Sequence, residues 1–274
     1  MRREFASQGE PAGGPAPTTL IDIVFPGDTN HHGTLFGGAG LAFMDRAAFI
    51  AATRHGRVPF VTGSCERVEF KKPAHVGEIV EFIATPVWAG KRSLTVEVEM
   101  IAATIDGTKR ELCTRGVFHM VAVGVERVAP DWSLVPLPTS HRPYPADEVR
   151  MTDIVFANQA NSSKKMFGGD ALAFMTKAAF VMSAKRARSQ SVLAASERMD
   201  FHRPIAVGSI VEVVARVVEV GRTSMRIDVE LWSEELMSGD RHLTARGVFV
   251  MVAVDGDSRP VAVDDGPAAS DGQD

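Results

Sequence analysis

The chain has 274 residues, of which 45% are hydrophobic and 23% charged, as in a folded globular protein of two domains. Its formal net charge of -4 argues against the broad basic surface that nucleic acid binding requires. No run of 18 apolar residues predicts a membrane span, so we expect no membrane partner. The only two cysteines lie in separate apolar runs, which favours a reducing, cytoplasmic location.

A long internal repeat organises the sequence. The segment FPGDTNHHGTLFGGAGLAFMDRAAF begins at Phe25 and recurs as FANQANSSKKMFGGDALAFMTKAAF from Phe156, an offset of 131 residues (156 minus 25). The same offset relates RGVFHMVAV from Arg115 to RGVFVMVAV from Arg246. The repeat therefore predicts a duplicated domain, with units at residues 19–125 and 150–256.

Three segments lie outside these units. Residues 1–18 are rich in Gly and Pro and predict a disordered leader. Residues 126–149 contain several prolines, which predicts an extended linker that cannot be helical. Residues 257–274 are polar and small, and we expect a disordered tail.

Each unit contains one helical pattern followed by strand patterns. LAFMDRAAFIAAT from Leu41 and LAFMTKAAFVMSA from Leu172 are apolar nearly all round, which indicates a buried helix. The later runs alternate or carry β-branched residues, and turn signals such as Asp106-Gly107 separate them. One helix and four or five antiparallel strands make an α+β unit.

Two motifs in each unit carry a family resemblance. The first unit has Asn30, Gly33, Leu35, Phe36, Gly37, Gly38 and Asp45 around the helix start. F-x-x-P-x-x-x-G follows at Phe70 and again at Phe201. These motifs resemble the hotdog fold of acyl-CoA thioesterases, in which an antiparallel sheet wraps a central helix. The tandem arrangement is similar to the animal cytosolic acyl-CoA hydrolases, and each unit is similar to the bacterial YciA-type enzymes.

The resemblance implies an architecture and a substrate. Hotdog units of this family pair through their sheets with antiparallel helices and bind acyl-CoA across the seam, so this chain would form its own pseudo-dimer. The implied activity is hydrolysis of fatty acyl-CoA to free acid and coenzyme A, at one active site shared between the repeats. Coenzyme A would enter only as part of the substrate, with no separate cofactor. By analogy we expect a homo-oligomer of three chains.

Asp45 is the first candidate for chemistry. A carboxylate within an apolar helix is costly to bury without a partner, and the equivalent residue in the second unit is Thr176. The scaffold therefore does not require an acid at this position. The alternative is a structural role, in which the carboxylate reaches solvent or pairs with Arg46 or Arg54.

The partner of Asp45 is expected in the other unit. Asp45 lies about 10 to 12 Å along the helix axis from its own Gly37 and Gly38, too far to act with that helix start. An antiparallel partner helix would bring Asn161, Gly168 and Gly169 alongside it instead. The reciprocal pair, Asn30 with Thr176, lacks a base. This sequence departs from the animal tandem enzymes, as the resemblance has them, in placing the acid in its first unit.

The expected mechanism follows from this pairing. Asp45 would act as general base on water or as nucleophile on the thioester, with Asn161 orienting the water or the carbonyl. Backbone N–H groups near Gly168 and Gly169 would receive the oxyanion. The sequence leaves the two roles of Asp45 open.

The resemblance also points to residues that contact coenzyme A. Small and hydroxyl side chains let pantetheine approach backbone amides, and Lys91, Arg92 and Arg222 could meet phosphates. Tight turns with solvated charges are the alternative interpretation of the same residues. The candidates are Gly63, Ser64, Cys65, Arg92, Ser93, Leu94, Ala194, Ala195, Ser196, Thr223, Ser224 and Met225.

Other chemistries receive less support. The adjacent His31 and His32 lack the spacing of a metal pair, so no metal is predicted. Cys65 and Cys113 are expected to pack in strands. There is no G-x-S-x-G nucleophile elbow and no hydratase-type Asp and His arrangement. A protein that binds or senses acyl-CoA without hydrolysing it remains the alternative function.

Overall fold

The protein, described by a computed structural model over residues 17–129, 131–138 and 145–263, consists of two similar units. The first contains β1 (Thr18–Ile23), η1 (Pro26–Asp28), α1 (Gly37–Gly56), β2 (Phe60–Cys65), β3 (Ile79–Ala89), β4 (Ser93–Ala103) and β5 (Arg110–Ala122). The short helix η2 (Val125–Arg127) follows. The second contains β6 (Glu148–Ile154), η3 (Ala157–Gln159), α2 (Gly168–Ala187), β7 (Gln190–Phe201), β8 (Ile210–Val220), β9 (Ser224–Glu234) and β10 (Arg241–Val254).

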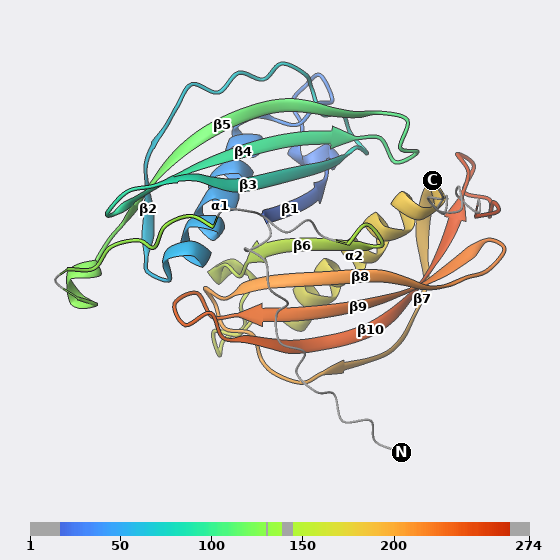
Figure 1. Ribbon diagram of the computed structural model, residues 1–274. Coiled ribbons are helices and arrows are strands. Elements are labelled where there is room, and N and C mark those ends of the chain that lie inside the picture. The colour runs from blue at the N-terminus through green and yellow to red at the C-terminus, as the bar shows by residue number, and fades with distance from the viewer. Residues whose placement is uncertain (1–16, 130, 139–144, 264–274) are drawn as a thin grey trace, which may run out of the picture.

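Each unit is one curled sheet around one helix. The strand orders are β1-β3-β4-β5-β2 and β6-β8-β9-β10-β7, so the two topologies are identical. All neighbouring strands pair antiparallel. In Figure 1 the sheet of the first unit arches over α1, and that of the second unit lies against α2. The predicted α+β fold with tandem hotdog units is confirmed.

The helices are apolar on most sides because the sheets enclose them. Met44 and Ile50 of α1 are fully buried and belong to one cluster with Val96, Val98 and other side chains of the first sheet. A second cluster surrounds Met175 of α2 in the same way. Each fully buried side chain of this size contributes about 1.5–3 kcal/mol through removal of apolar surface from water. The absence of a polar face on these helices is thus explained by packing.

The two units share their interiors. β1 and β6 lie side by side at the centre of the molecule (Figure 1). Ile79 of the first unit packs in the core of the second, and Ile210, its equivalent by the repeat, packs in the core of the first. The intrachain pseudo-dimer is therefore held by exchanged apolar side chains.

Ion pairs across the seam obey the same symmetry. Arg46 of α1 lies 3.1 Å from Asp153 of β6, and Lys177 of α2 lies 2.6 Å from Asp22 of β1. Both pairs are partly buried. Each helix is therefore attached by a cation to the first strand of the other unit, at positions that the offset of the repeat predicts to be equivalent.

A second set of pairs surrounds two buried carboxylates. Arg54 contacts Glu212 at 3.3 Å, and Lys185 contacts Glu81 at 2.9 Å. Burial alone would raise the pKa of both carboxyl groups, but the cations outweigh it. Lys185 and Arg110 hold the pKa of Glu81 below its usual value, and Arg54 heads the cations that do so for Glu212.

The segments after β5 and β10 occupy equivalent places, a relation that the sequence did not reveal. The Leu134 N–H donates to the Lys91 carbonyl at 3.0 Å, and the Val263 N–H donates to the Arg222 carbonyl at 2.9 Å. Leu134 and Val263 are both 8% exposed and pack against the core of their own unit. We call residues 131–138 and 258–263 the first and second straps.

The straps change the predicted boundaries. Residues 257–263, predicted to belong to a disordered tail, are ordered, and Pro260 bridges to Val254. That prediction is wrong for these residues because apolar Val261 and Val263 find a place in the core. β1 already begins at Thr18 and β6 at Glu148. The remaining leader, linker and tail residues at 1–16, 130, 139–144 and 264–274 lie outside the described residues.

α1 and α2 are the long helices of the described residues. Neither α1 nor α2 is apolar enough over a sufficient length to cross a bilayer.

Candidate active site

Asp45 lies in the middle of α1 and is partly buried. Its carboxylate accepts a hydrogen bond of 2.6 Å from the Thr62 hydroxyl on edge strand β2. The ion pairs of Arg46 and Arg54, the partners considered from the sequence, reach carboxylates of the second unit. The hydroxyl partner fixes one of the two carboxylate oxygens of Asp45.

Thr62 was missed by the sequence analysis, although the repeat contained a signal for it. The equivalent residue in the second unit is Leu193, so the acid and the hydroxyl are replaced together by Thr176 and Leu193. In the second unit the Thr176 hydroxyl donates to the Leu172 carbonyl of its own helix at 2.8 Å. At these equivalent positions, the first unit pairs a carboxylate with a hydroxyl donor and the second unit does not.

The charge of Asp45 contributes to the pKa of the Cys65 thiol. Burial, followed by the charges of Asp45 and Glu66, raises the pKa of Cys65 above its usual value. The thiol is thus protonated at neutral pH and a poor nucleophile. Cys65 is also exposed at the end of β2, so its predicted role as a packing residue is wrong, whereas Cys113 is fully buried.

Asn161 differs from its counterpart Asn30 in the hydrogen bonds of its side-chain amide nitrogen. The Asn161 side-chain oxygen accepts the N–H of Ser163 at 2.9 Å and of Lys165 at 3.2 Å. Asn30 forms the same type of turn, but its Nδ2 also donates to the Thr34 hydroxyl at 2.9 Å. Lys165 replaces Thr34 in the second unit, and within the described residues no acceptor contacts Asn161 Nδ2. The Asn161 amide can therefore donate to a ligand.

The loop that carries Asn161 begins beside α1. The guanidinium of Arg46, the neighbour of Asp45, lies 4.7 Å from the centre of the Phe156 ring and bonds to Asp153. Burial raises the pKa of Asp153 even though Arg46 opposes it. Phe156 directly precedes η3, the short helix before Asn161. The segment leading to Asn161 thus contacts the middle of the opposite helix.

Gly168 and Gly169 begin α2 and are exposed. The helix has no side-chain cap, and in the described part of the chain neither glycine N–H has a backbone acceptor. Such N–H groups, with the helix dipole, favour a negative charge. A side chain on Gly169 would lie 3.0 Å from the Phe167 ring, whereas one on Gly168 would meet nothing within 4 Å.

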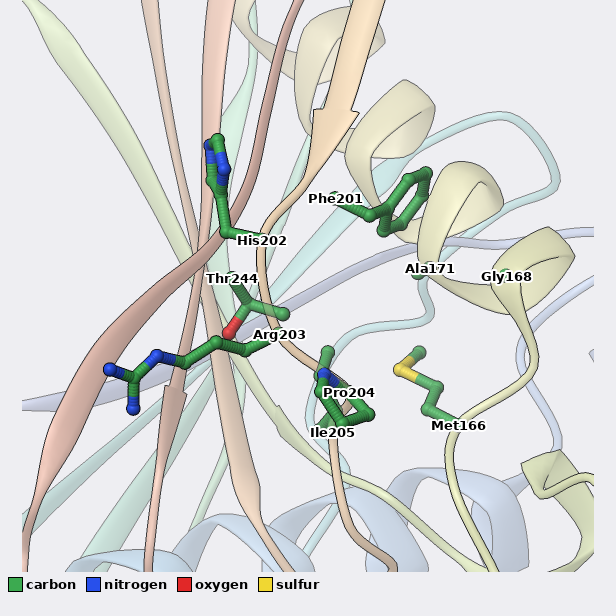
Figure 2. A pocket seen from close by; sticks show the side chains of 9 residues that line it. All are labelled: Met166, Gly168, Ala171, Phe201, His202, Arg203, Pro204, Ile205 and Thr244. Carbon is green, nitrogen blue, oxygen red and sulfur yellow. The ribbon is translucent and has the colours of Figure 1, made fainter. Parts of the chain in front are cut away.

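A cavity of about 250 Å³ adjoins Gly168. It lies between the start of α2 and residues 201–205, which include the end of β7 and the segment after it, as Figure 2 shows. Met166, Ala171 and Ile205 supply part of its wall. The cavity thus lies at the helix start that the sequence analysis assigned to the complete site.

The predicted contacts of coenzyme A divide into exposed and buried residues. Gly63 and Ser64 on β2, like 194–196 on β7, are exposed on edge strands. Leu94 and Met225 are 0% and 1% exposed, so contact through their side chains is excluded. Their position follows from strand alternation, which turns both side chains inward.

The remaining predicted contacts lie in two tight turns. The Ser93 carbonyl accepts the Gly90 N–H, and the Ser224 carbonyl accepts the Gly221 N–H, both at 2.8 Å. The Thr223 carbonyl accepts the N–H of Ala253. These bonds agree with the alternative interpretation of the residues as turns, and the exposed Arg222 side chain shares the second turn.

Arg92 and the adjacent histidines complete the candidates. Arg92 forms an ion pair with Glu126 at 2.5 Å. The rings of His31 and His32 lie with their centres 3.9 Å apart and their planes tilted by 44°. Over the described ranges, no group of three His, Cys, Asp or Glu side chains has the geometry of a metal site.

Comparison with known proteins identifies the family of the chain. The family model of the thioesterase superfamily matches residues 32–108 and 164–239, once in each unit. The chain belongs to the thioesterase superfamily. An acyl-CoA hydrolase of Agrobacterium tumefaciens with a crystal structure has 60% sequence identity and a TM-score of 0.85, covering 92% of this chain and 100% of its own.

Two relatives match the chain over different lengths. An uncharacterized acyl-CoA thioester hydrolase of Zymomonas mobilis is 35% identical over 119 residues, 43% of this chain and 80% of that protein. Acyl-coenzyme A thioesterase 11 of Mus musculus is 22% identical over 297 residues, 93% of this chain and 50% of that protein. The first aligns with a single unit and the second with the tandem.

Proposed function

We propose that this chain hydrolyses acyl-CoA to a free acid and coenzyme A at one site, built from Asp45 of the first unit and Asn161, Gly168 and Gly169 of the second. The observation that carries the single site is the hydrogen bond from Thr62 to Asp45. Its equivalents, Leu193 and Thr176, cannot form a carboxylate–hydroxyl pair. The related acyl-CoA hydrolases support the activity itself.

The proposed chemistry uses these groups in sequence. Asp45 removes a proton from water as the water oxygen attacks the thioester carbonyl carbon. The negative charge that develops on the carbonyl oxygen is stabilised by the N–H groups at the start of α2. Collapse of this intermediate breaks the C–S bond, and the departing thiolate takes up the proton as the acid is released. Asn161 Nδ2 orients the water or the carbonyl.

The test is release of coenzyme A thiol from acyl-CoAs of several chain lengths. Asp45→Ala should lower kcat by about 100-fold or more, since the base is lost. Thr176→Ala, the matched change in the second unit, should leave kcat unchanged. Equal losses in both variants would contradict a single site, and no turnover by the natural chain would favour an acyl-CoA binding protein instead.

We further propose that three chains associate and that the protein is located in the cytoplasm. Exposed aromatic side chains recur at equivalent places, with Phe36 58% and Phe167 60% exposed, which supports association of three chains through these surfaces. Light scattering that gives the mass of one chain would overturn this. A cytoplasmic location agrees with two free cysteines, and recovery of the protein in an oxidising compartment would overturn it.

A further inference from the structure

Arg46 lies between two aromatic rings that belong to different units. Its guanidinium carbon is 5.2 Å from the centre of the Phe43 ring on α1 and 4.7 Å from the centre of the Phe156 ring in the second unit. Nη1 of the same group donates to both carboxylate oxygens of Asp153, at 3.1 and 3.2 Å. A guanidinium within about 6 Å of a ring centre attracts the ring. Arg46 therefore holds two residues of the second unit against α1.

One of the two rings is fixed in the core of the first unit. Phe43 stacks on Phe82 with the ring centres 5.1 Å apart, and Phe82 is fully buried. The guanidinium is thus supported from the side of the core. The other ring, that of Phe156, is 42% exposed. Because packing covers only part of this ring, the contact with Arg46 is an important support for it.

Phe156 is joined through Gln159 to the start of α2. The Phe156 N–H donates to Oε1 of Gln159 at 2.9 Å, and the Gln159 carbonyl accepts the Phe167 N–H at 2.8 Å. Phe167 is the N-cap residue of α2 and directly precedes Gly168. Asn161 follows two residues after Gln159 in the same loop. A displacement of Phe156 would therefore reach both the Asn161 amide and the N–H groups assigned to the oxyanion.

The equivalent positions on the other side of the seam keep the ion pair but not the rings. Lys177 replaces Arg46, and its Nζ lies 2.6 Å from Asp22. Val213 replaces Phe82, so the stack that supports the guanidinium has no counterpart there. Over the described ranges, no aromatic ring lies over the Lys177 ammonium. At these positions, the cation between two rings occurs on the side that has the acid.

We propose that Arg46 is a positioning residue for hydrolysis, which holds the loop with Asn161 in place relative to Asp45 through its contact with Phe156. The inference rests on the proposed function, because it assumes that Asp45 and Asn161 share one site. Asp45 directly precedes Arg46 on α1, so the two residues move together. A planar guanidinium binds rings with its faces and a carboxylate with its edge, whereas the compact ammonium of lysine acts as a point charge.

Arg46→Lys is the direct test, because lysine keeps the charge and is the residue at the equivalent position. Thiol-release kinetics should show kcat lowered about 10-fold, with KM nearly unchanged because alignment and not binding is lost. Phe156→Leu should cause a similar loss. In the double variant the two losses should not add, since both changes interrupt the same contact.

Lys177→Met is the matched control, because it breaks the equivalent ion pair of the seam beside Thr176. It should make the chain easier to unfold in urea and leave kcat as in the natural chain. A second measurement is amide hydrogen exchange over residues 156–167. Exchange should become faster in Arg46→Lys and stay unchanged in Lys177→Met, since only the first change removes the support of Phe156.

Three results would overturn the inference: an unchanged kcat in Arg46→Lys, losses that add in the double variant, or an equal loss of kcat in Lys177→Met. Each would mean that Arg46 serves the seam as an ion pair and no more. Failure of the natural chain to hydrolyse any acyl-CoA would instead refute the proposed function. Hydrogen exchange would then decide by itself whether Arg46 orders the loop.

Discussion

Thr62 is expected to position Asp45 without touching the substrate. Its hydroxyl donates to one of the two carboxylate oxygens at 2.6 Å. Thr62→Val should lower kcat by about 10- to 100-fold, because a hydrogen bond to a charged group contributes about 1.5–3 kcal/mol. Steady-state kinetics should show KM nearly unchanged. Thr62→Ser should restore most activity, and Leu193→Thr should add none.

The proposed role of the Thr62 hydroxyl would be contradicted by a different pattern of activity among the Thr62 variants. If Thr62→Val and Thr62→Ser lose the same activity, packing of the methyl group and not the hydroxyl is what the site requires. A pH profile of kcat that is the same for Thr62→Val and the natural chain would also argue against an effect transmitted through Asp45.

The two asparagines should separate catalysis from loop structure. Asn161 has an amide nitrogen that can donate to a ligand, whereas that of Asn30 is bonded to Thr34. Asn161→Ala should therefore reduce kcat by about 10-fold or more. Asn30→Ala should leave hydrolysis intact and cost about 1 kcal/mol of stability through its turn. Thiol-release kinetics and urea unfolding measure both; full loss in Asn30→Ala alone would reverse the assignment of the site.

At the level of the elements, the second strap should be needed for stability. Ending the chain after residue 256 removes Val261 and Val263, and should lower the free energy of unfolding by about 2 kcal/mol, the contribution of one buried valine. Urea denaturation checks this. A chain that ends after residue 263 is the control, since it keeps both valines. Equal stability of the two shortened chains would show that the strap contributes nothing.

The elements also show what could be predicted from sequence. The buried helices followed from their lack of a polar face, and the repeat made the difference between Asp45 and Thr176 visible. Thr62 did not stand out because β2 contains an irregularity between Thr62 and Ser64, which obscures strand alternation. Such a shift depends on the pairing with β5, a contact between distant residues. The straps were missed because their short apolar segments resemble linker composition.

At the scale of the whole molecule, the carboxylates between the two units should make the folded protein less stable in acid. The pKa values of Glu81 and Glu212 are lowered in the folded state, so their contribution is present above about pH 4.5 and is lost as pH falls below it. Asp153, whose pKa is raised, has the opposite effect: its ionisation disfavours the fold above about pH 3.8. Among these three carboxyl groups between the units, two have a lowered pKa and one a raised pKa, so we expect a net loss of stability in acid.

Replacement of one carboxylate tests the seam directly. Glu212→Gln should destabilise the chain by about 3 kcal/mol at pH 7, since Arg54 and its neighbours lose a buried anion. The variant should also show a smaller change of stability between pH 7 and pH 4. Glu219→Gln, an exposed change on the same strand, is the control. An unchanged pH dependence in Glu212→Gln would show that acid acts elsewhere.

The exchange of Ile79 and Ile210 between the two cores has a consequence for descent by duplication. The second copy has Thr176 and Leu193 where the first has Asp45 and Thr62. It could not be deleted, because the interior of the first copy would then be left open to water. A copy that lacks this acid and this hydroxyl is therefore still required, because its side chains complete the core of the other copy.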